Sequence, residues 1–275
     1  KSAMNQSHYI CKIACWNVNS IRSRKDHIID WINQLAPDIL ALQETKVRDE
    51  DFPEKIFFEI GYGVIYFGQP SYNGVAIAYK KSSFQDPTNI NKNIPELLDN
   101  QSRLISGLFT DKRTGSEIKI ICIYVPNGSD IGTEKFFYKL NWLKYFLKFI
   151  KEEKREFSNI CVLGDFNIAP SDIDVHDPAK WKNKILCSME ERSCFQDILE
   201  QDFFDSYRFH NQDSGSYSWW DYRQASFRRN LGLRIDHILL SETLKNSCVN
   251  SGISIKPRKL EKPSDHAPCW TEVNL

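Results

Sequence analysis

Short apolar runs of four to eight residues recur along the whole chain, and they limit its possible folds more than any other feature. Such runs are too short for buried helices and suit buried β-strands. Two longer segments, 24–35 and 133–153, instead repeat apolar residues every three or four positions, which predicts helices. The lysines of the second segment are expected on its opposite, outer face. The predicted strands are Ile10–Trp16, Ile39–Leu42, Gly63–Tyr66, Val75–Tyr79, Leu104–Phe109, Ile118–Val125, Ile160–Leu163, Ile235–Leu240 and Cys269–Val273.

Helices that alternate with groups of strands predict an α/β fold of two stacked mixed β-sheets flanked by helices, which is a four-layer α/β sandwich. No repeat, low-complexity tract or Pro/Gly/Ser-rich linker divides the sequence, so we expect residues 10–275 to form a single domain. The hydrophobic content of 41% is enough for a sizeable core. Residues 1–9 are expected to be an N-terminal extension, in which Lys1–Ala3 ahead of Met4 look like a remnant of expression.

Two features of the sequence bear on the compartment of the protein. No segment approaches the roughly 18 uncharged apolar residues of a membrane helix, and the first residues lack the pattern of a secretory signal. Four of the eight cysteines, Cys15, Cys122, Cys161 and Cys269, lie in apolar runs, and no CxxC pair occurs. We therefore expect a cytoplasmic protein that does not enter a membrane, with reduced cysteines in its core rather than in a zinc site.

Polar side chains stand where several of the predicted strands begin or end. Residues i and i+2 of an extended segment point the same way, so such pairs can address one point in space. A single Asp or Asn after a strand is more often an ordinary turn residue. Several charged groups beside apolar runs imply a shared cation, a histidine or a polar cleft, because burying an unpaired carboxylate is costly. The residues are Asn17, Asn19, Gln43, Glu44, Tyr124, Asp165, Asn167, Asp236, Asp265 and His266.

The chemistry of these side chains restricts the cation. Carboxylate and amide oxygens without cysteine suit a hard ion that keeps its waters, such as Mg²⁺ or Mn²⁺, rather than zinc. A hard divalent ion in a carboxylate cleft suits phosphate-ester chemistry.

Seven motifs carry a family resemblance: WNVNSIRSR, LQETK, YVPNG, GDFN, SWWDYR, GLRIDH and KPSDHAP. In this order and spacing they resemble the exonuclease III family of abasic-site (AP) DNA endonucleases, within the endonuclease/exonuclease/phosphatase superfamily, over about residues 12–273. LQE and GDFN also fit the lipid and inositol phosphatases of that superfamily, whereas SWWDYR, GLRID and KPSDHAP are narrower and indicate DNA repair. The resemblance implies a two-sheet α/β sandwich with its cleft at one rim.

By this resemblance the protein is expected to be a Mg²⁺-dependent hydrolase, in which Mn²⁺ can substitute. It is expected to act as a monomer on double-stranded DNA, cutting 5′ of abasic sites, clearing blocked 3′ ends and trimming 3′ ends as an exonuclease. Two alternatives stay open. An inositol- or lipid-phosphate phosphatase or phosphodiesterase of the superfamily has no use for SWWDYR. A non-catalytic DNA-binding relative should have lost metal or water-positioning residues, yet the principal ones are present.

The resemblance also implies a metal site. Glu44 is expected to be the main metal ligand, with Asn17 and Asp265 close by and able to act through water. Asn19 stands where some relatives carry an aspartate, so its contact with a second metal is an open question, as is the number of ions. The alternative for Glu44 is a surface ion pair with Lys46.

Five residues are expected, by the same resemblance, to perform the chemistry. Asp165 would orient or deprotonate the attacking water, and Asn167 would hold the phosphate and that water. His266 would donate to a phosphate oxygen and would be kept charged by Asp236, because a carboxylate partner raises the pKa of a histidine. Tyr124 would donate to the leaving or a non-bridging oxygen. The sequence leaves open whether Asp165 or His266 is the general base.

DNA contacts are expected to be local, because 36 basic residues balance 36 acidic ones. By resemblance, Trp219 walls a small pocket for the flipped abasic sugar together with Leu233 and Ile235. The neighbouring Trp220 fits better as a core residue. The remaining DNA-binding candidates, each of which could instead be ordinary surface, are Lys46, Tyr72, Asn73, Arg103, Asn127, Arg223, Arg228 and Arg229.

Overall fold

The computed structural model describes residues 9–275, so the predicted N-terminal extension, except Tyr9, lies outside the described residues. The strands are β1 Ile10–Asn17, β2 Ile39–Gln43, β3 Tyr62–Phe67, β4 Val75–Lys80, β5 Thr88–Lys92, β6 Leu104–Thr110, β7 Glu117–Tyr124, β8 Ile160–Asp165, β9 Phe203–Asp205, β10 Trp219–Trp220, β11 Gly232–Leu233, β12 Asp236–Ser241, β13 Cys248–Ile253 and β14 Cys269–Asn274. The α-helices are α1 Lys25–Leu35, α2 Glu54–Phe58, α3 Glu134–Glu156, α4 Pro178–Trp181, α5 Met189–Leu199 and α6 Ser206–His210. Short 3-10 turns cover Asp49–Asp51, Asp172–Asp174, Glu242–Ser247 and Lys256–Lys259.

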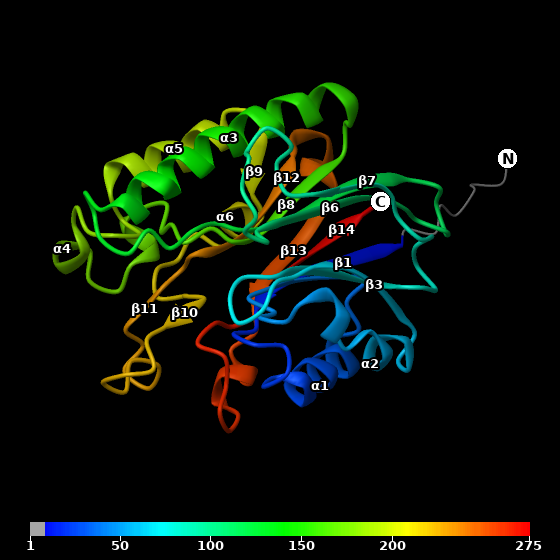
Figure 1. Cartoon of the computed structure of the whole chain (residues 1–275), viewed down its shortest axis with the longest axis horizontal. Coiled ribbons are helices and arrows are strands. Elements are labelled where there is room, and N and C mark those ends of the chain that lie inside the picture. Colours follow the sequence, from blue (N-terminus) through cyan, green and yellow to red (C-terminus); the bar gives the residue numbers. More distant parts are fainter. Residues whose placement is uncertain (1–8) are drawn as a thin grey trace, which may run out of the picture.

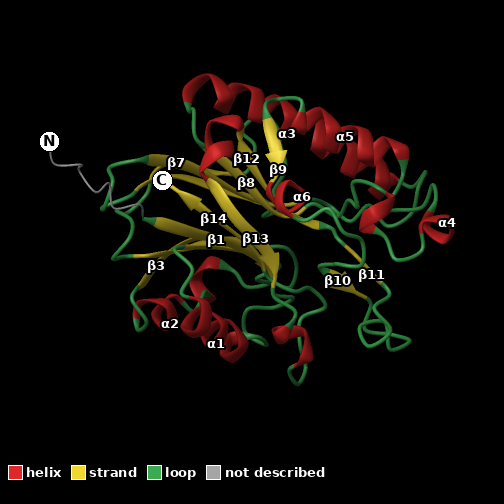
Figure 2. Cartoon of the chain, turned by 180° about the vertical axis from the view of Figure 1, so that it is seen from behind, coloured by secondary structure: helices red, strands yellow, loops and turns green. Residues whose placement is uncertain are grey.

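Two six-stranded sheets form the centre of the described part of the chain (Figure 1). One has the strand order β13-β14-β1-β2-β4-β3 and the other the order β5-β6-β7-β8-β12-β9, while β10 and β11 form a separate hairpin. Helices α1 and α2 cover the outer face of the first sheet, and α3 and α5 cover that of the second (Figures 1 and 2). The four-layer α/β sandwich predicted from the sequence is therefore confirmed.

Three apolar layers explain this arrangement. The inward faces of both sheets form one core, in which residues such as Ile13, Ile120 and Leu163 are completely buried. Helix α1 packs Ile28 and Trp31 against the outer face of the first sheet, and the buried apolar residues of α3 and α5 form the third layer, on the outer face of the second sheet. Within residues 9–275, no helix combines the length and apolar character that crossing a bilayer requires.

Helix α3 differs from its prediction on one face. Its first turn is capped, because the Thr133 hydroxyl accepts a hydrogen bond from the backbone N–H of Phe136. The helical spacing suggested that its lysines face solvent, but Lys139 is completely buried. Its ammonium forms an ion pair with the equally buried Glu191 of α5. A buried charge requires such a partner.

The strand directions bring the polar strand ends to one rim. Strands β1 and β2 are parallel, as are β7 and β8, so the carboxyl ends within each pair share an edge. Strand β12 runs antiparallel to β8 and pairs Asp236 with Asp165, so β12 begins at that edge. Strand β14 runs antiparallel to β1 and pairs Cys269 with Cys15, which places the segment before β14 near the end of β1.

Candidate active site

Gly164 allows strand β8 to present a carboxylate at the rim. Its φ angle is +141°, and a Cβ there would lie 2.0 Å from the carbonyl oxygen of Ile123, so another residue would push β8 away from β7. The following residue, Asp165, lies between Tyr124 of β7 and Asp236 of β12 in the sheet register. The sequence GD thus sets a buried carboxylate beside two other polar side chains.

Asn167 turns the chain immediately after β8. Its backbone is left-handed, with φ +50°, and its N–H donates to Oδ1 of Asp165 over 2.9 Å. Its side-chain amide donates to the carbonyl of Val125 over 2.8 Å. The ammonium of Lys139 also stabilises this turn by donating to the Asn167 carbonyl over 2.6 Å. These contacts fix the side chain whose predicted role is to hold phosphate.

Asp165 is the centre of a cluster of polar side chains. Its Oδ2 accepts a hydrogen bond from Nδ2 of Asn17 over 2.9 Å and lies 3.6 Å from Nε2 of His266. Burial, assisted by the nearby Asp236, raises the pKa of Asp165 to about 7, against the lowering effect of the His266 cation. A carboxylate with a pKa near neutrality is suited to accept a proton during the reaction.

His266 is oriented by Asp236. Its Nδ1 lies 2.8 Å from Oδ2 of Asp236, and because a carboxylate only accepts, Nδ1 carries the proton. Burial alone lowers the pKa of His266, but Asp236, Asp165 and Asp265 together raise it well above its ordinary value. The imidazolium form therefore keeps an Nε2–H, and the 3.6 Å separation from Asp165 leaves that donor available to a ligand oxygen.

The hairpin of β10 and β11 supports the Asp265-His266 segment. Trp219 and His266 form an isolated antiparallel bridge. The backbone N–H of Trp220 donates to the carbonyl of Asp265 over 3.2 Å, and that of Ala267 donates to the carbonyl of Ser218 over 2.8 Å. The indole Nε1 of Trp219 donates to Oδ2 of Asp265 over 3.1 Å.

Glu44 and Tyr124 meet on the other side of Asp165. The Tyr124 hydroxyl donates to Oε1 of Glu44 over 2.9 Å, although Tyr124 ends β7 of the second sheet and Glu44 follows β2 of the first. Burial and the carboxylates of Glu44 and Asp165 raise the pKa of Tyr124, so the phenol stays protonated and can donate. The guanidinium of Arg103 lies 4.9 Å from the centre of the Tyr124 ring.

The oxygen donors of the cluster fit a hard divalent ion. Oδ1 of Asp265 is buried and has no hydrogen-bond partner among residues 9–275, which leaves it free for a cation. Glu44 has one oxygen that no hydrogen bond uses within the same residues. Oδ1 of Asn19, by contrast, accepts from the Lys46 ammonium over 2.6 Å, and its Nδ2 donates to Tyr222. The side chain of Asn19 is thus engaged with a protein cation.

A second group of potential ligands lies close by. Asp165, Asp236 and His266 offer atoms that all lie within 4.8 Å of one another. The imidazole, however, uses Nδ1 to donate to Asp236 and has a raised pKa, and a protonated ring nitrogen cannot bind a metal. We therefore regard these three residues as a proton-holding group rather than as the site of an ion.

Four residues at this rim have left-handed backbone. Asn19, Glu44, Lys46 and Asn167 have φ angles of 46°, 54°, 59° and 50°. Glutamate and lysine rarely adopt this conformation, which costs free energy and is often found at functional sites. The turns after β1, β2 and β8 therefore direct polar side chains into the cleft at the expense of backbone strain.

Five of the predicted DNA-binding residues line one groove beside Glu44. The groove has a volume of about 790 Å³. Its lining includes the predicted residues Lys46, Tyr72, Asn73, Arg103 and Asn127, together with Tyr124. It also includes residues that carried no signal in the sequence because they come from separate loops: Gln69, Gln101, Lys135 and Tyr138.

Trp219 lines a smaller hollow on the other side of the cluster. This hollow of about 240 Å³ also includes His176 and Arg223. The other two residues predicted to wall an abasic-sugar pocket, Leu233 and Ile235, are 0% and 1% exposed and pack in the small core beneath Trp219. Their predicted contact with DNA stays a prediction.

The three arginines predicted to bind DNA differ in their surroundings. Arg223 is exposed and forms an ion pair with Asp221 at 2.8 Å. Arg228 lines a separate groove of about 960 Å³, which includes Trp220 and Arg258. Arg229 is exposed and donates to the carbonyl of Gln224. Trp220 is buried, as expected for a core residue.

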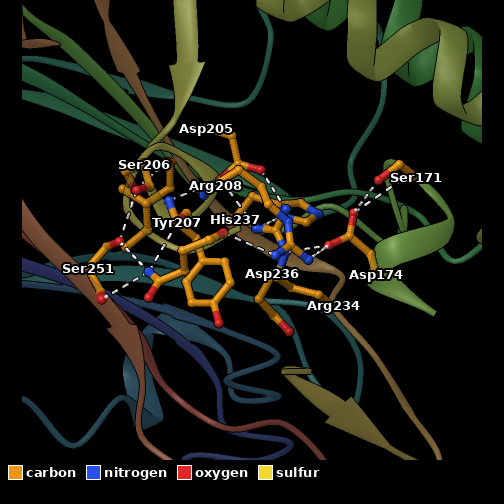
Figure 3. A network of polar contacts seen from close by, with 12 residues as sticks. Ser171, Asp174, Asp205, Ser206, Tyr207, Arg208, Arg234, Asp236, His237 and Ser251 are labelled. Atoms are coloured by element: carbon orange, nitrogen blue, oxygen red, sulfur yellow. Dashed lines mark hydrogen bonds and ion pairs between the residues drawn. The ribbon is translucent and has the colours of Figure 1, made fainter. Parts of the chain in front are cut away.

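A buried charge network supports the start of β12 (Figure 3). Arg234 is 1% exposed and donates to Asp174 at 2.7 Å and to Asp205 at 2.6 Å. Its third contact, at 3.1 Å, is with Nδ1 of His237, the residue after Asp236. The sequence did not indicate this network, although the charged Arg234 between apolar neighbours was a signal that could have suggested it.

Comparisons with known proteins agree with this geometry. Residues 14–266 match the Endonuclease/Exonuclease/phosphatase family. Exodeoxyribonuclease III of Haemophilus influenzae is 36% identical over 270 residues, covering 95% of this chain and 99% of the relative. The structure of a 3′ phosphatase from Neisseria bound to a product DNA hairpin has a TM-score of 0.90 at 38% identity, and covers 96% of this chain and 100% of that one. An AP endonuclease from Archaeoglobus fulgidus has a TM-score of 0.89 at 38% identity, with the same coverage.

Proposed function

This chain belongs to the Endonuclease/Exonuclease/phosphatase family, and on that premise we propose that it is a metal-dependent DNA repair nuclease of the exodeoxyribonuclease III type. It hydrolyses the phosphodiester 5′ of abasic sites in double-stranded DNA. It also removes phosphates and other blocking groups from 3′ ends and trims duplex DNA in the 3′ to 5′ direction. The resemblance to the exonuclease III family that the motifs indicated is confirmed.

One observation carries this proposal: residues far apart in the sequence meet in a single polar cluster. Nδ2 of Asn17 and Nε2 of His266 lie 2.9 Å and 3.6 Å from Oδ2 of Asp165. Asp236 accepts a hydrogen bond from Nδ1 of His266. A phosphodiesterase needs such an arrangement, because in-line attack on phosphorus depends on positioning and charge neutralisation.

Each side chain of the cluster has its own role in the proposed hydrolysis. Asp165 takes the proton of the attacking water or holds that water in line, since its pKa of about 7 suits either role. Asn167 holds a phosphate oxygen from a turn that three hydrogen bonds fix. His266 donates from Nε2 to a non-bridging oxygen. Tyr124 donates its single hydroxyl proton to a second oxygen after exchanging its bond to Glu44 for the substrate.

The residues present also fit a metal. When bound, Mg²⁺ neutralises charge that develops on the phosphate, and Mn²⁺ can substitute because both ions prefer oxygen ligands. Glu44 and Asp265 would hold the ion, with Asn17 nearby. Asn19 contributes by holding Lys46 rather than by binding the ion, which favours one metal over two.

The groove and the hairpin favour DNA over a small phosphorylated ligand. The groove of about 790 Å³ extends from Glu44 along Arg103 to Lys135, and it would accommodate the backbone of a long substrate. Trp219 lies on the opposite side of the cluster and offers an aromatic wall for a nucleotide. An inositol- or lipid-phosphate phosphatase would need neither feature.

A panel of four substrates tests the proposal. The panel contains a duplex with one abasic site, a duplex with a 3′ phosphate, an undamaged recessed duplex and an inositol polyphosphate, each with Mg²⁺ or with EDTA. We expect Mg²⁺-dependent reaction with the three DNAs and none with the inositol polyphosphate. The relative rates on the first two DNAs measure the balance between cleavage at abasic sites and removal of 3′ phosphates. Of the two similar solved structures, one is called a 3′ phosphatase and the other an AP endonuclease. Reaction only with the inositol polyphosphate, or binding of DNA without cleavage, would support an alternative function.

We further propose that residues 10–275 act as one catalytic domain, as a monomer in the cytoplasm. Light scattering of the protein mixed with a short abasic duplex in EDTA should give the mass of one chain per duplex. A mass of two chains per duplex would contradict the monomer.

A further inference from the structure

We propose that Trp219 is a positioning residue for the metal site, in addition to its predicted role as a pocket wall. Its indole N–H holds one oxygen of Asp265, so that the other oxygen faces the ion. This inference rests on the proposed function, because it takes Asp265 to be part of the metal site.

The two oxygens of Asp265 have different surroundings. Oδ2 accepts the hydrogen bond from Nε1 of Trp219 over 3.1 Å. Oδ1 is buried and has no hydrogen-bond partner among residues 9–275. An indole N–H can only donate and a carboxylate can only accept, so this bond is charge-assisted and directional. It holds the carboxylate with its unpartnered oxygen turned away from Trp219.

The backbone around Asp265 is already fixed by the same hairpin. The bridge between Trp219 and His266 and the bond from the Trp220 N–H to the Asp265 carbonyl tie the two segments together. With the main chain held, the freedom left to Asp265 is rotation of its side chain. The indole of Trp219 removes that rotation, and orientation of this kind typically changes metal affinity by about 10- to 100-fold.

The position of Trp219 also connects two parts of the site. The same side chain contacts Asp265 through its nitrogen and lines the hollow that contains His176 and Arg223. A nucleotide that moves the indole would therefore also move a carboxylate of the metal site. If Trp219 were only an apolar wall, replacing it with phenylalanine would leave the affinity for the metal ion unchanged.

The variant Trp219→Phe separates these two roles, because it keeps an aromatic ring and removes the N–H. We expect its Mn²⁺ dissociation constant, measured without DNA by electron paramagnetic resonance of free Mn²⁺, to rise about tenfold or more. Trp220→Phe is the matched control. It removes an indole N–H one residue away, whose partner is Oδ1 of Asn230 at 3.0 Å, and Mn²⁺ affinity should stay within about twofold of the wild type, the scale of an indirect effect.

A double-mutant cycle completes the test. In an Asp265→Ala background, Trp219→Phe should have no further effect on Mn²⁺ affinity, because the carboxylate that it orients is gone. In the unaltered protein, Mg²⁺ should shift the indole N–H resonance of Trp219 in a ¹⁵N spectrum and leave that of Trp220 in place. This readout does not depend on the folding of any variant.

The outcomes distinguish this inference from the proposed function. If wild type and Trp219→Phe bind Mn²⁺ equally, or if both tryptophan variants lose affinity equally, the positioning role of Trp219 is wrong while the nuclease function stands. If the wild type binds no Mn²⁺ and cleaves abasic DNA in EDTA, the metal-dependent function fails, and this inference fails with it.

Discussion

Acid should destabilise the protein through His237, which lies next to Asp236 on β12. Its Nδ1 faces a guanidinium nitrogen of Arg234 at 3.1 Å and its Nε2 faces the carbonyl of Ile168 at 2.8 Å. Because arginine only donates and a carbonyl only accepts, Nδ1 must be the acceptor and Nε2 must carry the proton. A second proton on Nδ1 would break the bond to Arg234 and set two cations against each other in the core (Figure 3).

The size of the effect follows from the pKa. Burial and the Arg234 cation lower the pKa of His237 from 6.5 to about 4 in the folded protein. Between these values the unfolded chain binds more protons, so stability rises with pH across this window and is lost as pH falls through it. The difference between the ordinary and the folded pKa, 6.5 minus 4, corresponds to about 3 kcal/mol in the free energy of unfolding. About 2 kcal/mol of this is lost between pH 7 and pH 5.

The measurement must isolate His237, because Asp165 acts in the opposite sense. The pKa of Asp165 is raised from 3.8 to about 7 by burial, so its protonation stabilises the folded state as pH falls through the same window. We therefore compare urea unfolding of the wild type with that of His237→Gln, which cannot be charged. Between pH 7 and pH 5 the wild type should lose about 2 kcal/mol more than the variant. Parallel curves for the two proteins would refute the assignment of a neutral, buried His237.

Three further substitutions test the site and its support. Asp165→Asn should lower single-turnover cleavage of abasic DNA by about 100-fold or more and leave DNA affinity in EDTA unchanged; lost affinity with normal turnover would contradict its role. Asp236→Asn removes the anion that raises the pKa of His266, so in a pH–rate profile the alkaline loss of activity should move to lower pH. Lys139→Met leaves the Glu191 carboxylate buried without a counter-charge and should lower the free energy of unfolding by about 3–5 kcal/mol, measured in urea. A decrease below about 1 kcal/mol would show that Glu191 finds another partner or a proton.

The fold was predictable where burial determined the pattern. Each of the nine predicted strands forms, because each contributes apolar side chains to one of the sheets. Five strands were not indicated by the sequence, and four of them show why. Strand β5 (Thr88–Lys92) has almost no buried side chain, and β13 (Cys248–Ile253) pairs with β14 through an irregular register that disrupts any alternation. Strands β10 and β11 have two residues each, which is too short for any period.

The sequence predicted which residues form the site better than it predicted the contacts between them. The spacing of Asp165 and Asn167 after an apolar run indicated a polar strand end, and the family motifs added His266. The partners of each side chain depend on segments far apart, such as Trp219 and Asp265, which are 46 residues apart. Sequence spacing likewise could not show that Asn19 is engaged with Lys46 rather than free for a metal.

The central claim is that separate strand ends meet at one rim to hold a hard ion against a DNA phosphodiester. A Mg²⁺ titration of single-turnover incision at an abasic site, for the wild type and for Glu44→Gln, tests it most directly. We expect EDTA to abolish incision, Mg²⁺ to restore it, and Glu44→Gln to need at least about tenfold more Mg²⁺ for half-maximal rate. Incision that persists in EDTA, or the same Mg²⁺ requirement in both proteins, would contradict the account.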